Sequence, residues 1–235
     1  MNRLYSILLT GLLLTPSYSL ARLEAGGGLS LAWPQGDFKQ QVDFAWGGAG
    51  RAGWTFGSQP AAAATVFFDF NYLNYGRERR VEPFSTTIPD VVVNVVTDNF
   101  MILVSPGLAF GVGRGPVRPY GEVFGGMTYI ATSTRIENRG LASETIAEST
   151  NFDDFTYNVG AGAGLKILVW KKDLDVKYPE LREALIDIKL SYVKGGQAEY
   201  LKKGSIRRSG GRVEYDTVQS SIDLMRLRLG VSLSF

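Results

Sequence analysis

Large apolar residues alternate with small or polar residues through most of the chain. The pattern is clearest over residues 225–235, where apolar side chains occupy the odd positions and small or charged ones occupy every even position. A period of two predicts a β-strand whose two faces meet different surroundings. The segment also ends on an aromatic residue, Phe235. The pattern is typical of a strand that turns one face to lipid and the other to a polar interior.

Seven other segments alternate in the same way, so the sequence predicts eight strands. They cover residues 23–33, 44–56, 63–72, 96–110, 118–132, 155–169 and 185–200, and the last strand begins near Thr217. The fifth has the weakest pattern, because Phe124 and Ile130 fall on its polar face.

The connections between these segments alternate in length. Long polar connections, expected as loops, cover residues 74–95, 133–153 and 198–216, with short turns at 57–60 and 113–117. This arrangement predicts an all-β fold, a transmembrane antiparallel up-and-down β-barrel with long loops on one side. We expect eight strands. Residues 88–95 offer two alternatives: they extend neighbouring strands, or they form an additional pair that would give ten.

The first residues have the features of an export signal. Arg3 precedes a short apolar stretch, residues 5–14, and small residues follow at Ser17, Ser19 and Ala21. A helix that spans a membrane needs about 20 apolar residues, and no later run approaches that length. We therefore expect a cleaved signal peptide, residues 1–21, and one barrel domain, residues 22–235, that crosses the membrane with strands.

Charged residues recur on the face of the strands expected to point inward. Nine charged residues occupy positions of the alternating pattern that point to this face: Glu24, Arg51, Asp69, Glu122, Lys166, Asp187, Lys189, Arg226 and Arg228. Acids and bases nearly balance, and buried charges are tolerated when they are paired. An eight-stranded barrel has just enough room for side chains. The sequence thus predicts a lumen filled by a charge network. Gly160, Gly162 and Gly164 have no side chains to fill the lumen along one strand. A narrow path for ions or small hydrophobic molecules is therefore an alternative.

Composition limits the chemistry available to the chain. Histidine and cysteine are both absent, which removes the usual general base, thiolate metal sites and disulfides. Basic residues number 25 against 23 acidic ones, without the basic face that a nucleic-acid partner requires. Residues 48–53 match G-x-G-x-x-G but lie within one strand, where the motif binds no dinucleotide. We predict no enzyme, no cofactor and no metal site.

Three passages resemble the OmpA-like small outer-membrane β-barrel proteins. They are the glycine-rich first strand leading into residues 34–38 and 47–50, the start of the fifth strand at residues 118–121, and the terminal strand. The resemblance implies an eight-stranded barrel in the outer membrane of a Gram-negative bacterium. It also implies that the barrel-assembly machinery reads the last strand, whose assembly signal would be Leu227, Leu229, Val231, Leu233 and Phe235. The family includes structural anchors, adhesins, small channels and enzymes.

The leading hypothesis is a non-enzymatic barrel with a plugged lumen that acts in envelope structure or surface interaction through its long loops. The alternative is a small channel or transport barrel. We expect a monomer with both termini in the periplasm, in contact with outer-membrane lipid. Basic residues in the outer loops could meet lipopolysaccharide phosphates. These are Arg77, Arg79, Arg80, Lys202, Lys203, Arg207, Arg208 and Arg212.

Overall fold

The computed structural model describes residues 21–57, 62–83, 92–138, 144–171, 181–209 and 212–235. Apart from Ala21, the expected signal peptide lies outside these residues. The described chain contains ten strands and one 3-10 turn, η2 (Phe38–Gln40). No helix in these ranges has the length and apolar character needed to cross a membrane.

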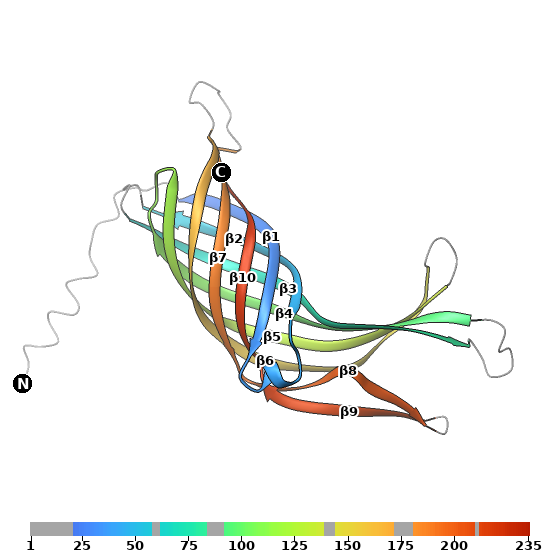
Figure 1. Ribbon diagram of the computed structural model, residues 1–235. Helices are drawn as coiled ribbons and strands as arrows, with labels where there is room; N and C mark the ends of the chain where they lie inside the picture. The colour runs from blue at the N-terminus through green and yellow to red at the C-terminus, as the bar shows by residue number, and fades with distance from the viewer. Residues whose placement is uncertain (1–20, 58–61, 84–91, 139–143, 172–180, 210–211) are drawn as a thin grey trace, which may run out of the picture.

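Eight strands close into an antiparallel barrel (Figure 1). They are β1 (Arg22–Gln35), β2 (Ala45–Phe56), β3 (Ala63–Pro83), β4 (Val92–Gly111), β5 (Val117–Glu137), β6 (Thr145–Lys171), β7 (Glu183–Gly195) and β10 (Asp223–Ser234). The order around the barrel is β1-β10-β7-β6-β5-β4-β3-β2, which confirms the predicted eight-stranded barrel.

The ten-stranded alternative is wrong. Residues 92–95 extend β4, because they pair with the outer part of β3. The two additional strands are β8 (Gln197–Ser209) and β9 (Arg212–Ser221), which form a separate two-stranded sheet outside the barrel. They include most of the predicted third long loop, residues 198–216, and the predicted start of the last strand near Thr217 is wrong, because β9 runs to Ser221 and β10 begins at Asp223.

The barrel closes at a seam between β1 and β10 that depends on glycine. Gly28 lies opposite Gly230 in the register of these strands. A Cβ atom at Gly28 would collide with the backbone of Leu229 and Gly230. The two strands can approach each other here because neither position carries a side chain.

The outer surface of the barrel is apolar over its middle and aromatic toward both ends. Trp54, Phe56, Phe110 and Trp170 are exposed toward the end where the chain enters β1. Toward the other end, Tyr72, Phe100, Tyr129 and Phe155 form a row across four neighbouring strands. Their ring centroids are 5.5, 6.3 and 4.7 Å apart along this row. Aromatic belts of this kind mark the two lipid–water boundaries of a membrane barrel.

Four strands continue well beyond the barrel and form a curved sheet that we call the arm (Figure 1). Pairing of β2 with β3 ends at Asn74, and pairing of β7 with β6 ends at Asn158. Beyond these points β3, β4, β5 and β6 still pair with one another. The arm comprises residues 75–83, 92–99, 132–137 and 145–157.

The expectation that residues 74–95 and 133–153 are loops is therefore wrong for most of their described residues. Polar residues do not distinguish a loop from a strand that continues beyond the lipid, and residues 93–99 of β4 are buried on both faces of this sheet. Cross-strand partners hold its polar side chains. The hydroxyls of Thr97 and Thr134 lie 3.0 Å apart, and Arg135 Nη1 lies 2.6 Å from Asp98 Oδ2.

Candidate functional site in the barrel lumen

Seven charged side chains meet in the middle of the lumen. They project from β2, β3, β5, β7 and β10: Arg51, Asp69, Glu122, Asp187, Lys189, Arg226 and Arg228. Each of these strands alternates, so its even or odd residues all face the lumen at successive heights. The seven side chains are at most 7% exposed. We call this group the lumen network.

Asp69 is the centre of the lumen network, because four cations surround its carboxylate. Oδ1 accepts hydrogen bonds from Arg51 Nε at 2.8 Å and from Arg228 Nη1 at 3.0 Å. Oδ2 accepts one from Lys189 Nζ at 2.9 Å, and Arg226 Nη2 lies farther away, at 3.8 Å. A carboxylate with this many partners gains enough attraction to offset the loss of its water.

The other two carboxylates connect the remaining walls. Glu122 lies 2.7 Å from Arg51 Nη2 and 2.9 Å from Lys189 Nζ. Asp187 accepts hydrogen bonds from Arg228 Nη2 at 2.5 Å and from the Tyr120 hydroxyl at 2.6 Å. The network thus joins opposite sides of the barrel through buried, charge-assisted contacts.

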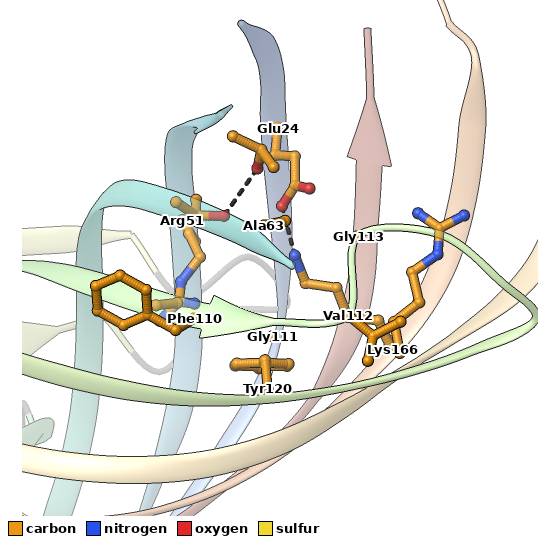
Figure 2. A pocket seen from close by; sticks show the side chains of 13 residues that line it. Glu24, Arg51, Ala63, Phe110, Gly111, Val112, Gly113, Tyr120 and Lys166 are labelled. Carbon is orange, nitrogen blue, oxygen red and sulfur yellow. Dashed lines mark hydrogen bonds and ion pairs between the residues drawn. The ribbon is translucent and has the colours of Figure 1, made fainter. Parts of the chain in front are cut away.

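Glu24 and Lys166, which the sequence also placed inside, form a separate ion pair closer to the chain termini. They line a small cavity of about 30 Å³ together with Arg51, Arg118 and Tyr120 (Figure 2). Arg118 itself donates to Glu183 Oε2 at 2.8 Å. We call this cavity the vestibule. The sequence reasoning did not include Arg118 or Glu183, because both lie at strand ends where parity is hard to assign.

Aromatic rings fill the space along the glycine-rich wall of β6. A Cβ atom at Gly160 would collide with the ring of Phe124, and one at Gly164 would lie 2.5 Å from the ring of Tyr120. These glycines therefore make room for aromatic side chains from β5 and leave no gap at these two positions. In the sequence, Phe124 falls on the polar face of its strand, and this departure from the alternation indicated that an aromatic ring points into the lumen.

The half of the lumen away from the termini is apolar, which the sequence reasoning did not expect. Six of its inward side chains are at most 1% exposed: Leu73, Met101, Leu103, Ile130, Val193 and Leu224. Aromatic rings of Phe38, Tyr75 and Tyr200 lie beyond them, with centroids 5.2 to 6.2 Å apart. The hydroxyl of Tyr75 donates to the Leu201 carbonyl at 3.4 Å. We call these nine residues the apolar plug. The six aliphatic residues lie inside the barrel next to the lumen network, and the three aromatic residues, from η2, the base of the arm and β8, pack against them.

Ion pairs also run across the arm, outside the barrel. Asp98 pairs with Arg77 and, at 2.6 Å, with Arg135. Glu137 lies 2.7 Å from Arg135 and 3.5 Å from Arg79. The hydrogen bond to Asp98 raises the pKa of the Arg77 guanidinium above its ordinary value, so Arg77 stays charged. These pairs join β3, β4 and β5 beyond the barrel.

The expected assembly signal lies on β10, between β1 and β7. Leu229 and Val231 are 41% and 49% exposed on the outer surface. Leu227 and Leu233 have the same parity, and the backbone N–H of Phe235 donates to the Leu23 carbonyl at 2.9 Å. The strand thus presents its apolar face outward and its charged residues, Arg226 and Arg228, inward.

The described residues contain no group of three or more side chains suited to hold a metal ion. The two catalytic requirements that the lumen would have to meet are a nucleophile or base and access for a substrate. Most buried charged groups here take part in ion pairs between an apolar plug and a small vestibule. Their geometry supports packing and closure of the barrel.

Comparison with known proteins agrees with this architecture. Residues 6–181 match the family model described as outer membrane protein beta-barrel domain. No curated protein matched the chain.

Among solved structures, Ail of Yersinia pestis with the heparin analogue sucrose octasulfate is 12% identical, with a TM-score of 0.42. The alignment covers 92% of this chain and 99% of Ail. OprG of Pseudomonas aeruginosa is 13% identical over 92% and 97% of the two chains, with a TM-score of 0.47. Neisserial surface protein A is 11% identical over 90% and 95%, with a TM-score of 0.40. By its match over most of its length, the chain belongs to the family of outer-membrane β-barrel proteins and is integral to the outer membrane of Gram-negative bacteria.

Proposed function

We propose that the protein is a non-enzymatic surface-interaction barrel, which contacts its partner through the arm and keeps its lumen closed. The observation that carries this proposal is the continuation of four barrel strands into one hydrogen-bonded sheet. Residues such as Pro83 and Val92 still pair at the far end of β3 and β4. A sheet continuous with the barrel places a recognition surface at a fixed distance from the membrane, which loops cannot do.

The arm has two open edges, and they differ in character. The edge of β3 carries Arg77, Arg79 and Arg80 and ends at Pro83. Charges and proline are the usual means of blocking strand addition at an edge. The edge of β6, residues 145–153, has Glu148 as its single charge before Asp153 and contains no proline. Among the described residues it pairs on one side with β5 alone.

The β6 edge therefore favours a partner that adds an extended strand. In strand addition, main-chain hydrogen bonds supply affinity and alternate side chains supply selectivity. The arm and the β8–β9 hairpin together carry acidic and basic residues in similar number, so charge alone does not define the partner. The proposal has three further parts. The outward aromatic rows contact lipopolysaccharide, the protein is a monomer, and the assembly machinery recognises β10.

The test uses the folded protein in nanodiscs, panned against random decapeptides displayed on phage. We expect selected peptides to alternate apolar and polar residues and to lose binding when proline blocks the edge. Proline is placed in separate variants at Ala147 and Glu148, because neighbouring N–H groups in a strand point to opposite sides. One variant blocks the open edge, and the other breaks the ladder with β5. Equal peptide binding by wild type and both variants would overturn the proposal.

A further inference from the structure

Three buried side chains next to the lumen network carry polar atoms without a hydrogen-bond partner among the described residues. They are Arg226 at Nη1 and Nη2, the Asn71 amide at both Nδ2 and Oδ1, and the Ser30 hydroxyl. Arg226 Nε itself donates to the Ser191 hydroxyl at 3.3 Å. All three residues are at most 1% exposed. Unpartnered buried polar groups are rare in folded proteins, and each one calls for a physical explanation.

The topology brings these three groups toward one another. Arg226 starts on β10 and crosses the lumen until Nη2 lies 3.8 Å from Asp69 Oδ2 on β3. Asn71 is the next inward position on β3, on the side of Asp69 that faces the apolar plug. Ser30 of β1 lies opposite Arg228 and so diagonally next to Arg226. The ring of Phe124 has its centroid 5.5 Å from Arg226 Cζ and forms a wall of the same region.

The lumen network carries an unbalanced charge. Four cations, Arg51, Lys189, Arg226 and Arg228, face three carboxylates, Asp69, Glu122 and Asp187. A guanidinium keeps its proton in proteins, so Arg226 cannot relieve the imbalance by becoming neutral. Arg226 also has the longest ion-pair distance of the four cations, 3.8 Å. The excess positive charge is therefore located at Arg226.

We propose that Arg226, Asn71 and Ser30 bind a small monovalent anion, of the size and charge of chloride, inside the barrel. The Arg226 Nη groups, Asn71 Nδ2 and the Ser30 hydroxyl offer the donors that an anion requires, and Asn71 Oδ1 is the one acceptor among these atoms. A water molecule would satisfy the same donors and leave the extra charge uncompensated. An uncompensated buried charge is costly, whereas a bound halide makes the group neutral as a whole. On the other side of the lumen network, the vestibule adds the cationic side chains of Arg51, Arg118 and Lys166 to the barrel interior.

The experiment compares urea unfolding midpoints in detergent at constant ionic strength, in sodium chloride, sodium bromide and sodium methanesulfonate. We expect the wild type to have a higher midpoint in chloride and bromide, with a shift that saturates with halide concentration. Asn71→Asp places a carboxylate beside Arg226, so this variant should be equally stable in all three salts. Arg226→Met should lose the halide effect as well. Arg114→Met, at an exposed position, is the matched control and should keep it.

A second measurement locates the ion. Crystals grown or soaked in bromide should show an anomalous scattering peak between Arg226 and Asn71, and this peak should be absent in Asn71→Asp crystals. The proposal is overturned if that position scatters as water alone in bromide. It is also overturned if the halide shift persists in Asn71→Asp, or if stability depends on pH through Lys189 and not on halide.

Discussion

Asp69→Asn tests the role of the lumen network most sharply. The change keeps the size of the side chain and removes one negative charge from a site that four cations surround within 4 Å. The network then contains four cations and two carboxylates. Removing one partner of a buried ion pair costs about 3–5 kcal/mol, because the other partner stays buried and unpaired. Asn retains an oxygen that accepts from Arg51 or Lys189, so we expect a loss near the lower end, about 3 kcal/mol.

The assay is urea unfolding in detergent, followed by the difference in SDS gel mobility between folded and unfolded barrel. Asp43→Asn makes the same chemical change at an exposed position and should alter stability by less than about 0.5 kcal/mol. Adding Lys189→Met to Asp69→Asn restores the original excess of one positive charge. We therefore expect the double variant to be more stable than the sum of the two single effects predicts. A loss below about 1 kcal/mol for Asp69→Asn would refute this account of the buried network.

Three other predictions concern packing, assembly and the arm. Gly160→Leu should lower the free energy of unfolding by about 1–3 kcal/mol in the same urea assay, because the new side chain would collide with the Phe124 ring. Gly48→Ala should be tolerated, because the space around Gly48 is open. If β10 is the assembly signal, Phe235→Ser should reduce the folded protein in outer-membrane fractions severalfold, and Phe235→Tyr should not. Asp98→Asn removes a carboxylate shared by two arginines, so amide hydrogen exchange should rise in the arm and stay unchanged in the barrel. Equal exchange of the arm in the variant and the wild type would contradict the role of these pairs.

The eight-stranded barrel could be predicted from the sequence because lipid and lumen impose opposite requirements on the two faces of a strand. The alternation in β6 and β10 records both faces at once, so parity alone placed Lys166, Arg226 and Arg228 inside. Parity does not record which inward side chains touch one another. The grouping around Asp69 depends on barrel closure and on the register between strands far apart in the chain.

The apolar plug and the arm were harder to predict for two different reasons. Leu73, Met101 and Ile130 face inward, but in a membrane barrel an apolar residue is equally compatible with lipid, so the usual alternation hides them. In the arm, polar and apolar residues of β4 are buried side by side over residues 93–99, so alternation weakens and the residues look like loops. A bulge between Asn74 and Gly76 also shifts the parity of β3 where the arm begins.

Single-channel recording in planar bilayers tests the central claim most directly, that the lumen network and the apolar plug close the barrel. Folded protein, verified by its SDS gel mobility, is inserted into the bilayer and recorded under an applied voltage in concentrated salt. The account predicts a bilayer conductance indistinguishable from that of the protein-free membrane. Steady, reproducible conductance steps from the unmodified protein would contradict it and favour the small transport barrel.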